Sequence, residues 1–400
     1  MNNPIAPHIS RPRNGCISRG AQLFGCLLLA TAMSGGVHAA PRIFFAGSDV
    51  SYFGYIQQHS GAYKICGKNL GLLQVFRKEG CNLIRLRLWR RATPAEIKKY
   101  GRSGTLNDLA YTLPLAQQVK RMGFVFDLNM HFSPTWADPG HQPVPAAWQG
   151  LTIRPLEKRI YTYCKRVITR LRQHHAMPDI VQPGNEMNNG ILWPPGQLHW
   201  KNGRSRGWHN YLGLLRAAIG GIYDASPSGK RPLILIHVAM SSAATFTDYY
   251  NHLVRAHIPF DAIGVSVYPF WGGTLAKAKT TLQALALRFN KPIFIAETAY
   301  PHLEQPGEHK IRGLRYPMSP AGQAEYVSRE IGILHSLRHG LGCGIIYWGC
   351  ELLPPPAGPG LGPWPGRSLF GAGGEALRSL DVLGRAAFPK VPVHMKSIVR

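Results

Sequence analysis

Short apolar segments alternate with amphipathic segments along most of the chain. Eight of the apolar segments are five to eight residues long, as expected for parallel strands that are buried on both faces. They cover residues 43–50, 82–89, 123–130, 180–184, 233–238, 262–268, 292–296 and 344–348. Pro183 lies inside the fourth of these segments, where its missing N–H would remove one hydrogen bond of the strand ladder.

The segments between the predicted strands repeat their apolar residues with a helical period. The clearest examples are residues 108–122, 158–174, 208–225, 275–288 and 321–338. Eight strands that alternate with helices predict the α/β class and a (β/α)8 TIM barrel in a single domain. The Pro- and Gly-rich segment 353–374 is expected to be a loop after the last strand, because residues 376–383 again have a helical pattern.

The first 39 residues differ from the rest of the chain. Arg11, Arg13 and Arg19 form a basic start, an apolar run follows over residues 21–33, and small residues precede Pro41. A signal peptide has these features, and the run is shorter than the about 20 residues of a membrane-spanning helix. We expect a signal peptide over 1–39 that is removed on export, and a folded domain over 40–400 that is secreted or periplasmic without a membrane segment.

Composition narrows the class of protein further. Apolar residues make up 45% of the chain, which permits a full core, and 46 Lys and Arg against 20 Asp and Glu give a net charge of +26. The basic residues are dispersed and form no nucleic-acid-binding motif, so no nucleic acid partner is expected. A basic surface would instead attract anionic polysaccharide. Five cysteines follow residue 39, and their pairing stays open; they are Cys66, Cys81, Cys164, Cys343 and Cys350.

Polar side chains gather where the predicted strands end. The active site of a (β/α)8 barrel lies at the C-terminal ends of its strands. At or near these ends the sequence has Asp49, Arg85, Arg87, His131, Asn185, Glu186, Tyr268, Glu297 and Trp348. A carboxylate directly after a buried strand is costly unless it is paired or functional. Two carboxyl groups about 5–5.5 Å apart cleave glycosidic bonds with retention, and Glu186 and Glu297 are the candidates for this pair.

Longer motifs resemble one family of enzymes. They are Gly-Ser-Asp-Val-Ser at 47–51, Asn-Leu-Ile-Arg-Leu-Arg-Leu-Trp at 82–89, Thr-Trp-Ala-Asp-Pro-Gly at 135–140, Gly-Asn-Glu-Met-Asn-Asn-Gly-Ile-Leu-Trp-Pro at 184–194, Tyr-Pro-Phe-Trp at 268–271 and Ala-Glu-Thr-Ala-Tyr-Pro at 296–301. From about residue 44 to 380 the chain resembles glycoside hydrolase family 53, the arabinogalactan endo-β-1,4-galactanases. The resemblance implies retaining endo-hydrolysis of β-1,4-galactan, the galactose side chains of type I arabinogalactan in pectin.

The resemblance also implies roles for individual residues. Glu186 would be the acid/base, Glu297 the nucleophile, and Asn185 the partner of the sugar 2-hydroxyl. Either Arg85 or Arg87 would keep Glu297 ionised, since a nearby cation lowers the pKa of a carboxyl group. The other candidates for substrate binding or for orienting Glu297 are Tyr268, Trp348, Trp136, Trp193, Trp271, Asp49, His131 and Asp138.

The chain departs from the family pattern around the expected cleft. Asn129 and Pro134 stand where the family has aspartates, Gly272 where it has a histidine, and Gly349-Cys350 where it has Glu-Pro. These differences leave two alternatives, a retaining glycosidase for a different β-linked polysaccharide and a carbohydrate-binding protein without turnover. Relatives can hold calcium after the last strand. Here Glu351 is the only carboxylate before Glu375, so neither a metal nor a cofactor is expected.

Overall fold

The barrel is formed by eight parallel strands. The computed structural model describes residues 43–58, 62–201, 204–304, 314–353 and 364–389, so the predicted signal peptide lies outside the described residues. The closed sheet has the order β1-β14-β13-β12-β11-β6-β5-β4, with β1 paired to β4. The strands are β1 Phe45–Asp49, β4 Leu83–Leu88, β5 Val125–Met130, β6 Ile180–Gln182, β11 Leu233–Ala239, β12 Ala262–Val267, β13 Ile293–Thr298 and β14 Gly342–Tyr347. The prediction of a (β/α)8 barrel is confirmed.

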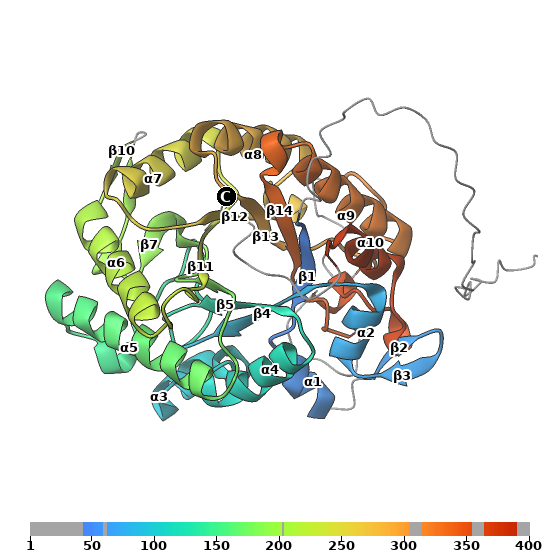
Figure 1. The fold of residues 1–400 in the computed structure, drawn as a ribbon, viewed down its shortest axis with the longest axis horizontal. Coiled ribbons are helices and arrows are strands. Elements are labelled where there is room, and N and C mark those ends of the chain that lie inside the picture. Colours follow the sequence, from blue (N-terminus) through green and yellow to red (C-terminus); the bar gives the residue numbers. More distant parts are fainter. Residues whose placement is uncertain (1–42, 59–61, 202–203, 305–313, 354–363, 390–400) are drawn as a thin grey trace, which may run out of the picture. The chain divides into compact units, whose positions relative to one another are not determined.

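Helices surround this barrel (Figure 1). They are α1 Phe53–Gln58, α2 Leu72–Glu79, α3 Pro94–Tyr100, α4 Leu109–Arg121, α5 Ile153–Gln173, α6 Trp208–Asp224, α7 Ala243–Arg255, α8 Leu275–Phe289, α9 Pro320–His335 and α10 Arg378–Ala386. Helix α7 is not among the clearest helical patterns of the sequence, because its Thr and Tyr residues have modest helix propensity. Its N-terminus is capped by Ser242, whose hydroxyl accepts a hydrogen bond from the Thr245 N–H.

Short β-hairpins lie in the loops between these elements. The first pairs β2 Tyr63–Ile65 with β3 Lys68–Leu70, the second β7 Gly190–Ile191 with β8 Gly196–Gln197, and the third β9 His199–Lys201 with β10 Arg204–Arg206. The last two belong to the long connection between β6 and α6, on the side of the barrel where the strands end.

One predicted strand is shorter than its apolar run. Strand β6 ends at Gln182, so Pro183 follows the strand and removes no hydrogen bond from the ladder. The prediction that Pro183 lies inside this strand was wrong, because an apolar run does not mark where the backbone leaves the sheet. The chain turns at Gly184, whose φ of 128° is open to glycine alone at low cost.

The two ends of the described chain meet beside β1. Helix α10 packs against α9, α2 and β1. The backbone N–H of Phe44 donates to the carbonyl of Phe388 at 2.7 Å, and the N–H of Phe388 donates to Phe44 at 2.9 Å. Because the last helix fills the gap between the first helices and α9, it completes the ring around the barrel. No helix of the described residues is long and apolar enough to cross a membrane.

The barrel interior changes from apolar to polar along the strands. Every strand contributes to one buried apolar cluster, which contains Phe45, Leu83, Val125, Ile180, Leu235, Ala262, Phe294, Ala296, Cys343 and Ile346. Residues two positions further along a strand share the same face. Those positions hold Arg85, Asp127, Gln182 and His237, all of them completely buried. The apolar cluster therefore closes one end of the barrel, and polar side chains occupy its interior toward the C-terminal ends of the strands.

A stability prediction follows from the close approach of β1 to β4. A Cβ atom on Gly47 would come within 1.7 Å of the Leu83 carbonyl oxygen, whereas a Cβ on Gly332 in α9 would meet nothing within 4 Å. We expect Gly47→Ala to lower the free energy of unfolding by at least about 2 kcal/mol. Gly332→Ala should change it by less than about 1 kcal/mol, in the stabilising direction. Urea denaturation of both variants tests this, and equal stabilities would contradict the described strand packing.

Candidate active site

Glu297 is held in place by two donors. Its Oε1 lies 2.6 Å from Nη2 of Arg85, and its Oε2 accepts a hydrogen bond from the Tyr268 hydroxyl at 2.9 Å. Burial and the Glu297 charge raise the pKa of Tyr268 well above its ordinary value, so the phenol remains a donor. Both carboxylate oxygens are therefore engaged, and the orientation of Glu297 is fixed.

An irregularity in the sheet turns Glu297 toward the interior. In a regular strand, Thr298 would share the inner face with Phe294 and Ala296. The pairing of β13 with β14 shifts its register between Ile295 and Thr298. Thr298 instead faces α9, where its hydroxyl donates to Glu330 at 2.9 Å, and Glu297 lines the pocket at the mouth of the barrel. Such irregularities commonly re-aim a side chain beside an active site.

Glu186 faces Glu297 from the end of β6. Its backbone is in the left-handed region, with φ 45° and ψ 54°, which is costly for a residue other than glycine. Its carboxyl group is hydrogen-bonded to Ser266, and burial, followed by the charge of Glu297, raises its pKa to about 8. One oxygen of Glu186 lies within 4.8 Å of an oxygen of Glu297. The two carboxyl groups thus combine a protonated acid with a neighbouring carboxylate that is paired to an arginine.

Ser266 and His237 support Glu186 from inside the barrel. The Nε2 atom of His237 lies 2.7 Å from the Ser266 hydroxyl oxygen. Burial and the positive charge of Arg85 lower the pKa of His237 well below its ordinary value, so the ring is neutral. The sequence interpretation missed both residues, since they lie within strands and their direction depends on the register of the sheet.

The side-chain amide of Asn185 is held by three hydrogen bonds. Its Oδ1 accepts from Arg85 and from Asn129, both at 3.1 Å, and its Nδ2 donates to the Ala137 carbonyl at 2.7 Å. The backbone carbonyl of Asn185 also accepts a hydrogen bond from the Gln142 side chain at 2.8 Å. Since an amide nitrogen has two hydrogens, the second can face a ligand in the pocket.

The two predicted arginines have different partners. Arg85 binds Glu297, whereas Arg87 places Nη1 3.1 Å from Asp49 Oδ1. The guanidinium of Arg87 lies over three aromatic rings at 4.8–5.1 Å from their centroids, those of Tyr52, Trp136 and Trp348. Asp49 also lies 3.5 Å from Nε of Arg85 and is completely buried. Asp49 therefore fixes both arginines from below the pocket.

The pocket has a volume of about 330 Å³ and brings most of the predicted site residues together. Its lining includes Arg87, His131, Trp136, Asp138, Asn185, Glu186, Tyr268, Trp271, Glu297 and Trp348. Asp49, Arg85 and Trp193 are not among the residues that line it. The indole N–H of Trp193 donates to the Asn189 carbonyl at 2.7 Å. Trp364 also lines the pocket, but it follows a Pro- and Gly-rich segment whose path no sequence pattern indicates.

One group of side chains at the site also has the composition of a metal site. Ligand atoms of Glu186, His237 and Glu297 lie within 4.8 Å of one another. However, both oxygens of Glu297 already accept hydrogen bonds, and Arg85 places a positive charge beside them. With Glu186 protonated near neutral pH, this set suits proton transfer better than cation binding.

The proximity of the two carboxyl groups predicts a linked titration. Replacement of Glu297 by Gln removes the second cause of the raised pKa of Glu186 but leaves its burial. The pKa of Glu186 should therefore fall from about 8 while remaining above the value of an exposed glutamate. Carbon-13 NMR of the labelled carboxyl groups measures this midpoint. Glu325→Gln, at a half-buried position of α9 outside the pocket, is the control, and equal Glu186 midpoints in the two variants would contradict the coupling.

Comparison with known proteins identifies the family. Residues 45–383 match the profile of glycosyl hydrolase family 53. An uncharacterized protein in the bgaB 5′ region of Niallia circulans is 33% identical over 85% of this chain and 93% of that protein. An arabinogalactan endo-β-1,4-galactanase of Cellvibrio japonicus is 30% identical over 80% of this chain and 84% of that enzyme. The GH53 catalytic domain of Ignisphaera aggregans has a TM-score of 0.78 at 32% identity, covering 87% of this chain and 97% of that domain. The chain therefore belongs to glycosyl hydrolase family 53 and is a glycoside hydrolase.

Proposed function

We propose that this chain cleaves internal β-1,4-galactosidic bonds in the galactan side chains of type I arabinogalactan, with retention of configuration. The observation that carries the proposal is the separation of Glu186 and Glu297, whose nearest oxygens lie within 4.8 Å. Retaining glycosidases have carboxyl groups about 5–5.5 Å apart, whereas inverting enzymes need about 6.5–9.5 Å to admit a water molecule. The separation therefore favours direct attack by a carboxylate.

In the first step Glu297 is the nucleophile. Its oxygen attacks the anomeric carbon while the bond from that carbon to the glycosidic oxygen breaks. Glu186 transfers its proton to the departing oxygen, so the leaving chain departs as a neutral alcohol and Glu186 becomes a carboxylate. The raised pKa of Glu186, caused by burial and then by the charge of Glu297, keeps this proton in place at neutral pH.

In the second step Glu186 acts as a base. It takes a proton from a water molecule, whose oxygen attacks the anomeric carbon and releases Glu297 as a carboxylate. Two inversions at the same carbon leave its configuration unchanged. Arg85 and Tyr268 orient the carboxylate of Glu297 before it attacks and again after it is released.

The remaining side chains of the pocket position the sugar. The free N–H of Asn185 suits a bond to the 2-hydroxyl of the sugar that is attacked. Trp348 and Trp136 offer ring surface for the apolar face of the sugar, and their packing around Arg87 makes both rings rigid. The choice of galactan rests on the family and on relatives such as the Cellvibrio japonicus enzyme, which is named an arabinogalactan endo-β-1,4-galactanase.

Two further expectations concern the setting of the enzyme. The signal peptide proposed for residues 1–39 would export the chain and bring it to plant polysaccharide outside the cell. Without Arg11, Arg13 and Arg19 the chain would keep a net charge of +23, which would attract acidic polysaccharide such as the pectin backbone that carries galactan. This attraction would weaken with added salt.

Hydrolysis of debranched galactan tests the proposal. The chain without residues 1–39 should release reducing ends, and the first product should be the β-anomer by proton NMR. Glu297→Gln and Glu186→Gln should each lower kcat by at least about a thousandfold, because each removes a group that acts on the reacting bond. Gly332→Ala, at an exposed position of α9 that does not line the pocket, is the control.

Other outcomes would change the proposal in specific ways. A folded chain that cleaves another β-linked polysaccharide but not galactan would show that the altered rim residues changed the substrate. Binding of galactan without cleavage would indicate a carbohydrate-binding protein. An α-anomer as the first product would contradict the retaining mechanism.

A further inference from the structure

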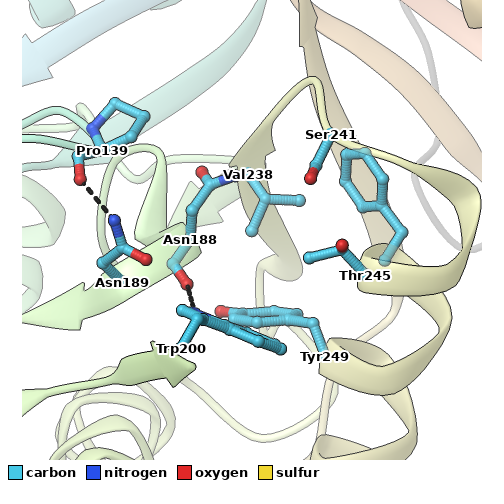
Figure 2. Close-up of a pocket in the computed structure, with 9 residues that line it drawn as sticks. Pro139, Asn188, Asn189, Trp200, Val238, Ser241, Thr245 and Tyr249 are labelled. Carbon is cyan, nitrogen blue, oxygen red and sulfur yellow. Dashed lines mark hydrogen bonds between the residues drawn. The ribbon is translucent and has the colours of Figure 1, made fainter. Parts of the chain in front are cut away.

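Two more cavities continue from the catalytic pocket. The first has a volume of about 390 Å³ and shares Asp138, Glu186, Tyr268 and Trp271 with the catalytic pocket. The second has a volume of about 420 Å³ and shares Pro139 with the first. Figure 2 shows this outer pocket between the loop that carries Asn188, the end of β11 and the start of α7. The three cavities form a series that starts at the carboxyl pair and ends beside α7.

The position of Glu186 indicates which part of a polysaccharide each cavity would hold. Glu297 lines the catalytic pocket but not the next cavity, whereas Glu186 lines both. Under the proposed function, the sugar that is attacked lies against Glu297, and the leaving chain lies on the side of the proton donor. The intermediate cavity thus receives the first sugar of the leaving chain. The outer pocket lies where the following sugars of that chain continue.

The outer pocket has the side chains of a sugar site. Trp200, Phe246 and Tyr249 supply aromatic surface. In Figure 2 the rings of Trp200 and Tyr249 are seen nearly edge-on below Val238, and the hydroxyl of Ser241 points toward the space between Val238 and Thr245. An aromatic surface with a few polar groups beside it suits the apolar face and the hydroxyl edge of a pyranose.

The ring of Trp200 is held in place by its neighbours in the protein. The indole N–H of Trp200 donates to the Asn188 carbonyl at 3.1 Å, and the ring of Trp208 meets Trp200 edge-on at 6.2 Å. Asn188 is itself anchored to the backbone of Ala239, through its Oδ1 at 2.7 Å and its Nδ2 at 2.8 Å. Because Trp200 is already rigid, less side-chain conformational entropy is lost when a ligand binds.

We propose that the outer pocket is a binding subsite for the leaving-group side of the polysaccharide, with Trp200 as its stacking platform. This inference rests on the proposed function, because the reaction defines which side is the leaving side. The subsite would hold the second or third sugar beyond the cleaved bond. It would favour internal cleavage by requiring several sugars on that side.

Cleavage of a defined oligosaccharide tests the subsite. β-1,4-Galactohexaose labelled at its reducing end gives labelled products whose lengths report where the bond was cut. Trp200→Ala should shift cleavage toward the reducing end, with at least about a fivefold change in the ratio of labelled monosaccharide to labelled trisaccharide. The ratio does not depend on the fraction of folded enzyme. Leu287→Ala, at a position of α8 that is 68% exposed, is the control and should leave the ratio unchanged.

The outcomes separate the two proposals. Hydrolysis by the wild-type chain with the same product ratio in Trp200→Ala would overturn the subsite alone. Absence of hydrolysis by the wild-type chain would overturn the proposed function and, with it, the assignment of a leaving side. Trp200→Phe, which keeps an aromatic surface, should restore most of the wild-type ratio; a ratio equal to that of Trp200→Ala would exclude stacking as the cause.

Discussion

The ion pair between Arg85 and Glu297 is the interaction on which the rest of the site depends. Its 2.6 Å contact lies inside the barrel, where an unpaired charge would be strongly destabilising. Asp49 binds both Arg85 and Arg87, so two cations and two carboxylates form one buried network. Arg85 also donates to Asn185 and to the Ala296 carbonyl. One guanidinium thereby contacts Glu297, Asn185 and the backbone at the irregularity of β13.

Burial also shifts two neighbouring carboxyl groups, those of Asp127 and Glu351, toward the protonated form. Burial raises the pKa of Asp127 to about 7, and burial followed by the charge of Asp49 raises that of Glu351 to about 7. Glu186 has the highest pKa of these three groups, about 8, because burial and the charge of Glu297 act together. The same low-polarity interior that makes the ion pair necessary thus also raises the pKa of Glu186, on which its proposed role as the acid depends.

The sequence predicted the features that depend on local pattern. Eight apolar runs and their helical spacers predicted the barrel, and the position of polar residues at strand ends predicted Glu186 and its neighbours. The features that the sequence did not predict depend on how neighbouring strands pair in the barrel. Ser266 and His237 face the site only because of how β11 and β12 pair, and Glu297 faces it through a register shift. The sequence also left open which arginine pairs with Glu297. Arg85 does so and Arg87 does not, because the two side chains lie at different depths in the barrel. Trp200 and Trp364 come from long connections without a periodic pattern.

The central claim is that Glu297 attacks the sugar while Glu186 supplies the proton. A 2-deoxy-2-fluoro-β-galactobiosyl fluoride tests it most directly, because the fluorine slows release of the glycosyl-enzyme and the fluoride leaves without protonation. Peptide mass spectrometry of the trapped protein locates the bound sugar. We expect a single sugar adduct on the peptide that contains Glu297, and retention of this adduct in Glu186→Gln. An adduct on Glu186, or turnover of the reagent through a released α-product, would contradict this account.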